Sequence, residues 1–183
     1  MADCVVAVVH GEAGARVEGL WSEIERRWGA TRSHTVAPPH VTLAIVRGRP
    51  EPARLAAALA AVARRHATFA VAGAGYGIFV GQGSESPVVH LAVTRTPRLS
   101  ALHQSVVDAL VAAGLDVDGQ SLADHWRPHV TLADTGLDAA LVGQAVAYLV
   151  EHGPKRWTLE IDSISVAASI GEVTLEQRLT GAG

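Results

Sequence analysis

The stretches PPHVTLAIVRG, residues 38–48, and RPHVTLADTG, residues 127–136, contain the same five residues, His-Val-Thr-Leu-Ala, each time directly after a proline. The two copies begin at His40 and His129, about half a chain length apart. This separation is too long for a solenoid, whose repeat units run to roughly 20–45 residues. The repetition therefore indicates either a duplicated fold or one chemical device built twice.

The first copy has the pattern of a β-strand with two chemically different faces. Successive side chains of a strand point to opposite sides, so His40 and Thr42 share one face. The opposite face carries the apolar side chains of Val41, Leu43 and Ile45. We therefore expect an imidazole and a hydroxyl about 7 Å apart in one polar row, backed by an apolar row that packs into the core.

The second copy repeats this arrangement. His129 and Thr131 lie on the polar face, and Val130 and Leu132 lie on the core face. The proline before each histidine restricts the backbone at the entrance to the strand, so each histidine is predicted to begin its strand at a defined place. If the two strands face each other across a pseudo-twofold axis, the two polar rows line one cleft.

The rest of the chain alternates between strand and helix patterns. Apolar, β-branched runs predict strands, and apolar residues at three- and four-residue spacing predict helices. The predicted order is strand, helix, strand, helix, two strands, helix, strand, helix and a terminal hairpin. This hairpin joins strands at 157–169 and 172–179 around Gly171. The glycine-containing strand at 68–83 is expected to be bent or bulged.

The predicted order repeats along the chain. The elements of the first half can be laid over those of the second half with one leading strand missing, which predicts an α+β fold of two related lobes. No linker rich in Pro, Gly or Ser divides the two halves. Residues 1–183 are therefore predicted to form a single domain made of two pseudo-symmetric lobes.

Composition narrows the classes of partner and compartment. The 183 residues carry a formal net charge of −3 and no run of Lys and Arg, so a long nucleic-acid tract is not an expected partner. A small phosphate or an RNA end needs only a local group of donors. The single cysteine, Cys4, allows no intrachain disulfide and favours a reducing compartment. The apolar run at 4–9 is too short for a signal peptide or a membrane span. We expect a cytoplasmic monomer that does not contact membranes.

Two histidines and two threonines around one cleft suit the cleavage of a phosphodiester. A neutral histidine can take a proton from attacking water while a protonated one delivers a proton to the departing oxygen, because imidazole titrates near ~6.5. Threonine hydroxyls can donate hydrogen bonds to the non-bridging oxygens as negative charge shifts in the transition state. This scheme needs neither a metal ion nor another cofactor.

The two H-x-T-L tetrads resemble those of the 2H phosphoesterase superfamily, which includes bacterial 2′-5′ RNA ligases and RNA 2′,3′-cyclic phosphodiesterases. The resemblance implies a bilobal, duplicated α+β fold, in which we expect two antiparallel sheets to line a central cleft with helices on the outside. It also implies an enzyme that acts without a metal on 2′,3′-cyclic phosphates of nucleotides or RNA ends, or on 2′-5′ linkages. The implied catalytic residues are His40, Thr42, His129 and Thr131.

Further residues are candidates for substrate binding. Arg127 lies two residues before the second motif histidine, so extended backbone points both side chains the same way, and Arg127 either holds phosphate or lies exposed at the strand end. His90 occupies the polar face of its strand and either reaches the cleft or is satisfied elsewhere. The rings that could stack on a base, although core packing is their commoner role, are Tyr76, Phe79 and Trp126.

Other interpretations stay open. A binding module of the same fold could hold a nucleotide with little turnover, and an assay with a 2′,3′-cyclic nucleotide separates it from an enzyme. A metal site is another, since His125 and His129 have the i, i+4 spacing of a helical ligand pair, but Pro128 between them argues against such a helix. The pattern does not say which histidine is the base. Nor does it say whether the substrate is a tRNA, an RNA end, a cyclic mononucleotide or an ADP-ribose cyclic phosphate.

Overall fold

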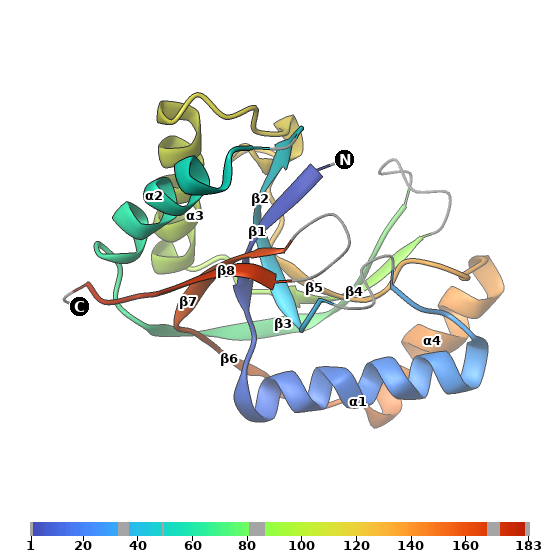
Figure 1. Cartoon of the computed structure of the whole chain (residues 1–183). Helices are drawn as coiled ribbons and strands as arrows, with labels where there is room; N and C mark the ends of the chain where they lie inside the picture. Colours follow the sequence, from blue (N-terminus) through green and yellow to red (C-terminus); the bar gives the residue numbers. More distant parts are fainter. Residues whose placement is uncertain (1, 33–36, 49, 81–86, 168–172, 182–183) are drawn as a thin grey trace.

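The computed structural model describes residues 2–32, 37–48, 50–80, 87–167 and 173–181, and Figure 1 shows the chain. Its elements follow the predicted order except in the terminal hairpin. They are β1 (Ala2–Val8), α1 (Gly11–Trp28), β2 (His40–Arg47), α2 (Pro52–Ala63), β3 (Phe69–Phe79), β4 (Val88–Val93), α3 (Pro97–Ala112), the 3₁₀ turn η1 (Gly119–Ser121), β5 (His129–Ala133), α4 (Ala139–His152), β6 (Thr158–Ile161), β7 (Ser163–Ala167) and β8 (Val173–Arg178).

The described strands form two four-stranded sheets. Sheet one has the order β2-β1-β7-β8, and sheet two has the order β5-β4-β3-β6. All neighbouring strands are antiparallel. Each motif strand, β2 or β5, stands at one edge of its sheet, and the two motif strands contact each other. The predicted α+β fold with two antiparallel sheets is confirmed.

The α-helices of the described chain cover the sheets from outside. α2 and α3 pack together on sheet one, with α3 against β2 and α2 against β7 and β8. α1 contacts β5, and α4 contacts β3 and β4, so this pair covers sheet two. Figure 1 shows the two helix pairs at opposite sides of the molecule. Because α1 precedes β2 but covers the sheet of β5, the two sheets are not separate halves of the chain.

Local signals set the helix ends. α1 ends at Gly29, whose φ of 64° is a left-handed conformation that glycine adopts without strain. α3 begins after Thr96, whose hydroxyl accepts a hydrogen bond from the amide of Leu99. α4 begins after Asp138, whose carboxylate accepts one from the amide of Leu141. These caps satisfy backbone donors that a helix leaves without partners.

The glycine-containing strand β3 is bent, as its sequence predicts. Its register against β4 shifts between Gly73 and Tyr76. Gly75, which lies between them, has a φ of +99°, a conformation that residues with side chains rarely adopt. After the shift Tyr76 lies opposite Leu91, a fully buried residue of the core. The bend therefore decides which face of sheet two each later residue of β3 occupies.

The predicted first strand of the terminal hairpin is in fact two strands. The chain breaks at Asp162, where β6 leaves its partner β3 in sheet two and β7 joins β1 in sheet one. β7 and β8 form the predicted hairpin, and the turn predicted around Gly171 lies outside the described residues. A single alternating strand does not explain the burial, because the apolar positions change phase at the break. The residues of β6 and β7 that belong to the main core are Leu159, Ile161, Ile164 and Val166.

Candidate active site

A cavity of about 660 Å³ opens between the two sheets. Residues of β1, β2 and β7 line it from sheet one, and residues of β3, β4 and β5 line it from sheet two. The chain at 120–127, which leads into β5, contributes a further part of the wall. A volume in the range of roughly 300–1,000 Å³ is typical of sites for small molecules and cofactors.

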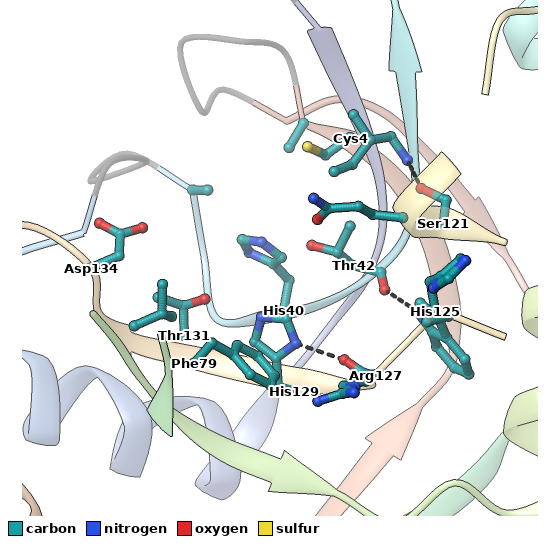
Figure 2. Close-up of a pocket in the computed structure, with 16 residues that line it drawn as sticks. Cys4, His40, Thr42, Phe79, Ser121, His125, Arg127, His129, Thr131 and Asp134 are labelled. Atoms are coloured by element: carbon teal, nitrogen blue, oxygen red, sulfur yellow. Dashed lines mark hydrogen bonds between the residues drawn. The ribbon is translucent and has the colours of Figure 1, made fainter. Parts of the chain in front are cut away.

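All four motif side chains line this cavity. His40 and Thr42 come from β2, and His129 and Thr131 come from β5. Figure 2 shows the two imidazoles near each other, with the threonines to either side. The valine between each histidine and threonine is buried in the core, as the strand alternation predicts. The two polar rows therefore meet in one cavity.

Each motif histidine is held by the backbone in the same way. Nδ1 of His40 lies 2.7 Å from the carbonyl oxygen of Pro38, and Nδ1 of His129 lies 2.7 Å from that of Arg127. A carbonyl oxygen only accepts, so Nδ1 carries a proton and donates in both rings. The neutral rings therefore have an unprotonated Nε2, which is the nitrogen that can exchange a proton with a ligand.

The surroundings of His129 favour its neutral form. Burial lowers the pKa of His129 below its ordinary value, because the imidazolium loses hydration. The hydrogen bond to the Arg127 carbonyl acts in the opposite direction and offsets only part of this effect. At neutral pH this ring is suited to accept a proton.

His90 packs against His129 and is not among the residues that line the cavity. It is buried on β4 opposite Gly77, where an added Cβ would come within 2.6 Å of the His90 Nε2. Its ring stacks on the cavity-lining Phe79 with centroids 3.9 Å apart and meets the His129 ring edge-on at 5.3 Å. Burial and, next, the charge on His129 lower the pKa of His90 to about 4. His90 is therefore a neutral ring packed against a motif histidine.

Both motif strands carry a β-bulge at the same place. The pairing of β2 with β1 steps from Thr42 to Ala44, and the pairing of β5 with β4 steps from Thr131 to Ala133, so the intervening leucine is the extra residue. The bulge changes the face of the residues that follow. Ile45 therefore lines the cavity, which corrects its predicted place in the core.

Among the other candidates, Arg127, Trp126 and Phe79 line the cavity and Tyr76 does not. Arg127 is exposed and lines the wall beside the second motif. Trp126 is buried, lines the wall and donates its indole N–H to the Thr42 carbonyl at 2.8 Å. The register shift in β3 turns Tyr76 away, and its hydroxyl lies 3.4 Å from the carbonyl oxygen of Pro154, after α4.

The cavity also contains residues that the motifs do not reveal. Asp134 stands in the second motif where Ile45 stands in the first, and the shared bulge brings both to the wall. The turn η1 contributes Ser121, whose hydroxyl accepts a hydrogen bond from the Ile45 amide at 2.8 Å. Burial and, next, the charge of Asp3 raise the pKa of the Cys4 thiol to about 11, so this cavity-lining cysteine is protonated at neutral pH.

Among the residues that the structure describes, no group of three or more His, Cys, Asp or Glu side chains is arranged to hold a metal ion. His125 and His129, the pair with helical spacing, lie in a turn and in β5. In the same part of the chain no helix has the length and apolar character needed to cross a membrane.

Known proteins share this fold. TT0787 of Thermus thermophilus is 16% identical, with a TM-score of 0.66 and 100% of each chain covered. E. coli LigT in complex with 3′-AMP is 18% identical, with a TM-score of 0.59, over 97% of this chain and 96% of that chain. Kluyveromyces marxianus Usb1 is 7% identical, with a TM-score of 0.53, over 97% and 98%. No curated protein sequence matches the chain.

At identities this low, the solved structures show only that the fold is shared. A family model shows the family to which the chain belongs. The model described as the 2′-5′ RNA ligase superfamily matches residues 13–171, which include both motifs. A superfamily of phosphoesterases and RNA ligases supports enzymatic activity of that type. The chain belongs to the 2′-5′ RNA ligase superfamily, the 2H phosphoesterases.

Proposed function

We propose that this protein is a metal-independent phosphoesterase that acts on the 2′,3′-cyclic phosphate of nucleotides or RNA ends, or on 2′-5′ phosphodiester linkages. The observation that carries the proposal is the convergence of two His-x-Thr rows on one cavity, with both histidines bound to the backbone through Nδ1. Displacement at phosphorus uses an acid, a base and donors to the non-bridging oxygens. LigT has been solved with 3′-AMP, NADP+ and ATP, which supports a small nucleotide as ligand.

In the proposed hydrolysis, water attacks the phosphorus of the cyclic phosphate while Nε2 of His129 takes one of its protons. A new P–O bond forms opposite the ribose oxygen that leaves, and the bond from that oxygen to phosphorus breaks. Protonated His40 gives its Nε2 proton to the leaving oxygen. The product carries one free ribose hydroxyl and one phosphate monoester. The lowered pKa of His129 suits the histidine that must start neutral.

Four other side chains complete the proposal. Thr42 and Thr131 donate to the non-bridging oxygens from opposite sides of the phosphate. Arg127 attracts the phosphate from the rim of the cavity, and Trp126 forms part of the wall against which the nucleotide packs. His90 packs against the ring of His129 without lining the cavity, and Tyr76 lies outside the proposed site.

Hydrolysis of a 2′,3′-cyclic nucleotide is expected to survive excess EDTA and to show a bell-shaped pH dependence of kcat/KM. His129 must be neutral to accept a proton, and burial lowers its pKa, so the acidic limb should have its midpoint below about 6.5. The basic limb reports loss of the proton from the group that acts as the acid. Initial rates measured across this pH range, with and without EDTA, check both expectations.

Two outcomes contradict this proposal in different ways. Loss of turnover in EDTA, with recovery on adding a divalent cation, rules out the metal-free mechanism. Saturable nucleotide binding without turnover identifies instead a binding module of the same fold.

Arg127→Ala is expected to raise KM more than it lowers kcat. Its exposed guanidinium lines the wall of the cavity, where it attracts phosphate about equally in the ground and transition states. Steady-state kinetics with a cyclic nucleotide measure the two constants separately. Arg98→Ala, at an exposed position of α3, is the matched control. An unchanged KM for Arg127→Ala would place this side chain away from the bound phosphate.

We further infer that residues 1–183 act as one domain with two related lobes. The consecutive strands β6 and β7 enter different sheets, and one core cluster includes residues of both sheets. All four motif side chains of the proposed site come from one chain, and a monomer stays our proposal for the working unit. A lone thiol at Cys4 fits the reducing conditions of the cytoplasm.

A further inference from the structure

Two of the four tryptophans in the chain hold the backbone of the two motif threonines. Nε1 of Trp21, on α1, donates to the carbonyl oxygen of Thr131 at 2.9 Å. Nε1 of Trp126, in the segment before β5, donates to the carbonyl oxygen of Thr42 at 2.8 Å. The two indoles come from unrelated segments, yet they make the same bond to the same residue of each motif.

The position of these bonds matches the position of the bulges. In each motif strand the extra residue is the leucine directly after the threonine, so the regular ladder is interrupted there. A backbone carbonyl near such an interruption needs a donor from outside the ladder when it is buried. The indole N–H supplies that donor and fixes the threonine relative to the helix or loop behind it.

Both indoles are themselves firmly placed. Trp21 and Trp126 are buried, and each has a guanidinium over its ring. The carbon atom of the Arg32 guanidinium lies 3.3 Å from the Trp21 ring centroid, and that of Arg95 lies 5.5 Å from the Trp126 centroid. His103 stacks on Trp126 with centroids 3.8 Å apart and an interplanar angle of 9°. A cation over an indole draws electron density from the ring, which strengthens its N–H as a donor.

The other two tryptophans make no such contact. Nε1 of Trp28 donates to the side-chain oxygen of Gln144, near the surface. Nε1 of Trp157 donates to the hydroxyl of Tyr76 at 3.4 Å, although Trp157 is as buried as Trp126. Trp157 is therefore a matched control for the loss of a buried indole N–H elsewhere in the core.

We propose that Trp21 and Trp126 are positioning residues, each of which sets the aim of one threonine hydroxyl through its hydrogen bond to that threonine's carbonyl. Trp126 acts on Thr42, and Trp21 acts on Thr131. The inference rests on the proposed function, in which these hydroxyls bind the phosphoryl oxygens. It predicts that each tryptophan acts on one particular threonine, which a general role in core packing would not produce.

The test is a crossed double-mutant cycle on turnover of a 2′,3′-cyclic nucleotide. Trp126→Phe keeps a ring and removes the N–H, and is expected to lower kcat about 3- to 30-fold, as for one misplaced hydrogen-bond donor, with a smaller change in KM. In the Thr42→Val background the same substitution should cost less than about 2-fold, because the hydroxyl it positions is absent. In the Thr131→Val background it should keep its full effect.

Trp21→Phe should show the reverse pattern, losing its effect in Thr131→Val and keeping it in Thr42→Val. Trp157→Phe should leave kcat within about 2-fold in every background, as expected for independent sites. Equal effects of Trp126→Phe and Trp21→Phe in both threonine backgrounds would overturn the proposal, since they would show that the indoles act on the fold as a whole. So would wild-type kcat in both folded tryptophan variants.

Two further measurements give a result when a variant unfolds or when the wild-type protein has no turnover. If a phenylalanine variant melts below the assay temperature, benzothienylalanine at the same position keeps the two-ring shape and replaces only the N–H by sulfur. If the wild-type protein does not turn over the cyclic nucleotide, the proposed function fails by itself. The same cycle is then read in the affinity for adenosine 3′-monophosphate, where the crossed pattern supports the positioning roles and its absence refutes them.

Discussion

Replacing His129 or His40 with alanine is expected to lower kcat for a 2′,3′-cyclic nucleotide by about 10²–10⁴-fold, because each change removes one positioned proton transfer. Both imidazoles line one cavity, and each donates from Nδ1 to a backbone carbonyl. Neither a neighbouring water nor the other histidine can reproduce a nitrogen held in this way. The measurement is steady-state turnover at the pH optimum of the wild-type protein.

The pH profiles of these variants separate the two roles. His129→Ala should abolish the acidic limb, since that limb reports protonation of the base, and His40→Ala should abolish the basic limb. His152→Ala, at an exposed position on α4, is the control and should match the wild type. Turnover within a few-fold of wild type in folded His40→Ala or His129→Ala would refute the two-histidine mechanism.

Thr42→Val and Thr131→Val are expected to lower kcat by up to about 10²–10³-fold each, the effect of losing one donor that tightens in the transition state. Valine keeps the β-branched shape that suits a strand, so sheet pairing should be preserved. Each threonine lines the cavity two residues after a motif histidine. Thr→Ser at the same positions keeps the hydroxyl and should retain much of the rate.

Turnover of all four threonine variants on one cyclic nucleotide checks this expectation, and thermal melting confirms that each variant is folded. Wild-type turnover in both folded valine variants would mean that the hydroxyls do not bind the phosphate. The paired-row description of the catalytic chemistry would then have to be abandoned, even though both side chains line the cavity.

The sequence predicts the parts of this site that depend on strand alternation over a few residues. His40 and Thr42 share a face because they are two residues apart, and the same holds for His129 and Thr131. The sequence also shows the repeated pattern on which the family resemblance rests. The pairing of the two rows in one cavity follows only from the way in which β2 and β5, each at the edge of its own sheet, come together.

The sequence does not predict positions that depend on irregular pairing. Alternation assigns Ile45 to the core, but a bulge adds one residue before it and turns it to the cavity. Tyr76 likewise comes after a register shift in β3, which turns its side chain away from the cavity. The break at Asp162 leaves a trace, since apolar positions change phase there, yet the pattern cannot say which sheet each half joins. The hydrogen bonds of Trp21 and Trp126 to the threonine carbonyls give no signal in the sequence, because the partners are about 80 or more positions apart.

The exchange of strands between the sheets also sets an order of assembly. Sheet two is built from residues 69–161, whereas sheet one must bring β7 and β8 back to β1 across nearly the whole chain. Closing so long a loop costs chain entropy before any strand contact offsets it, so sheet two can assemble first as the chain leaves the ribosome. β2, which carries His40, has its complete sheet around it only after β7 has paired with β1 and β8 has paired with β7. A nascent chain would thus hold one motif histidine, His129, in sheet two before β2 with His40 is fully supported, and the proposed site would be completed late in folding.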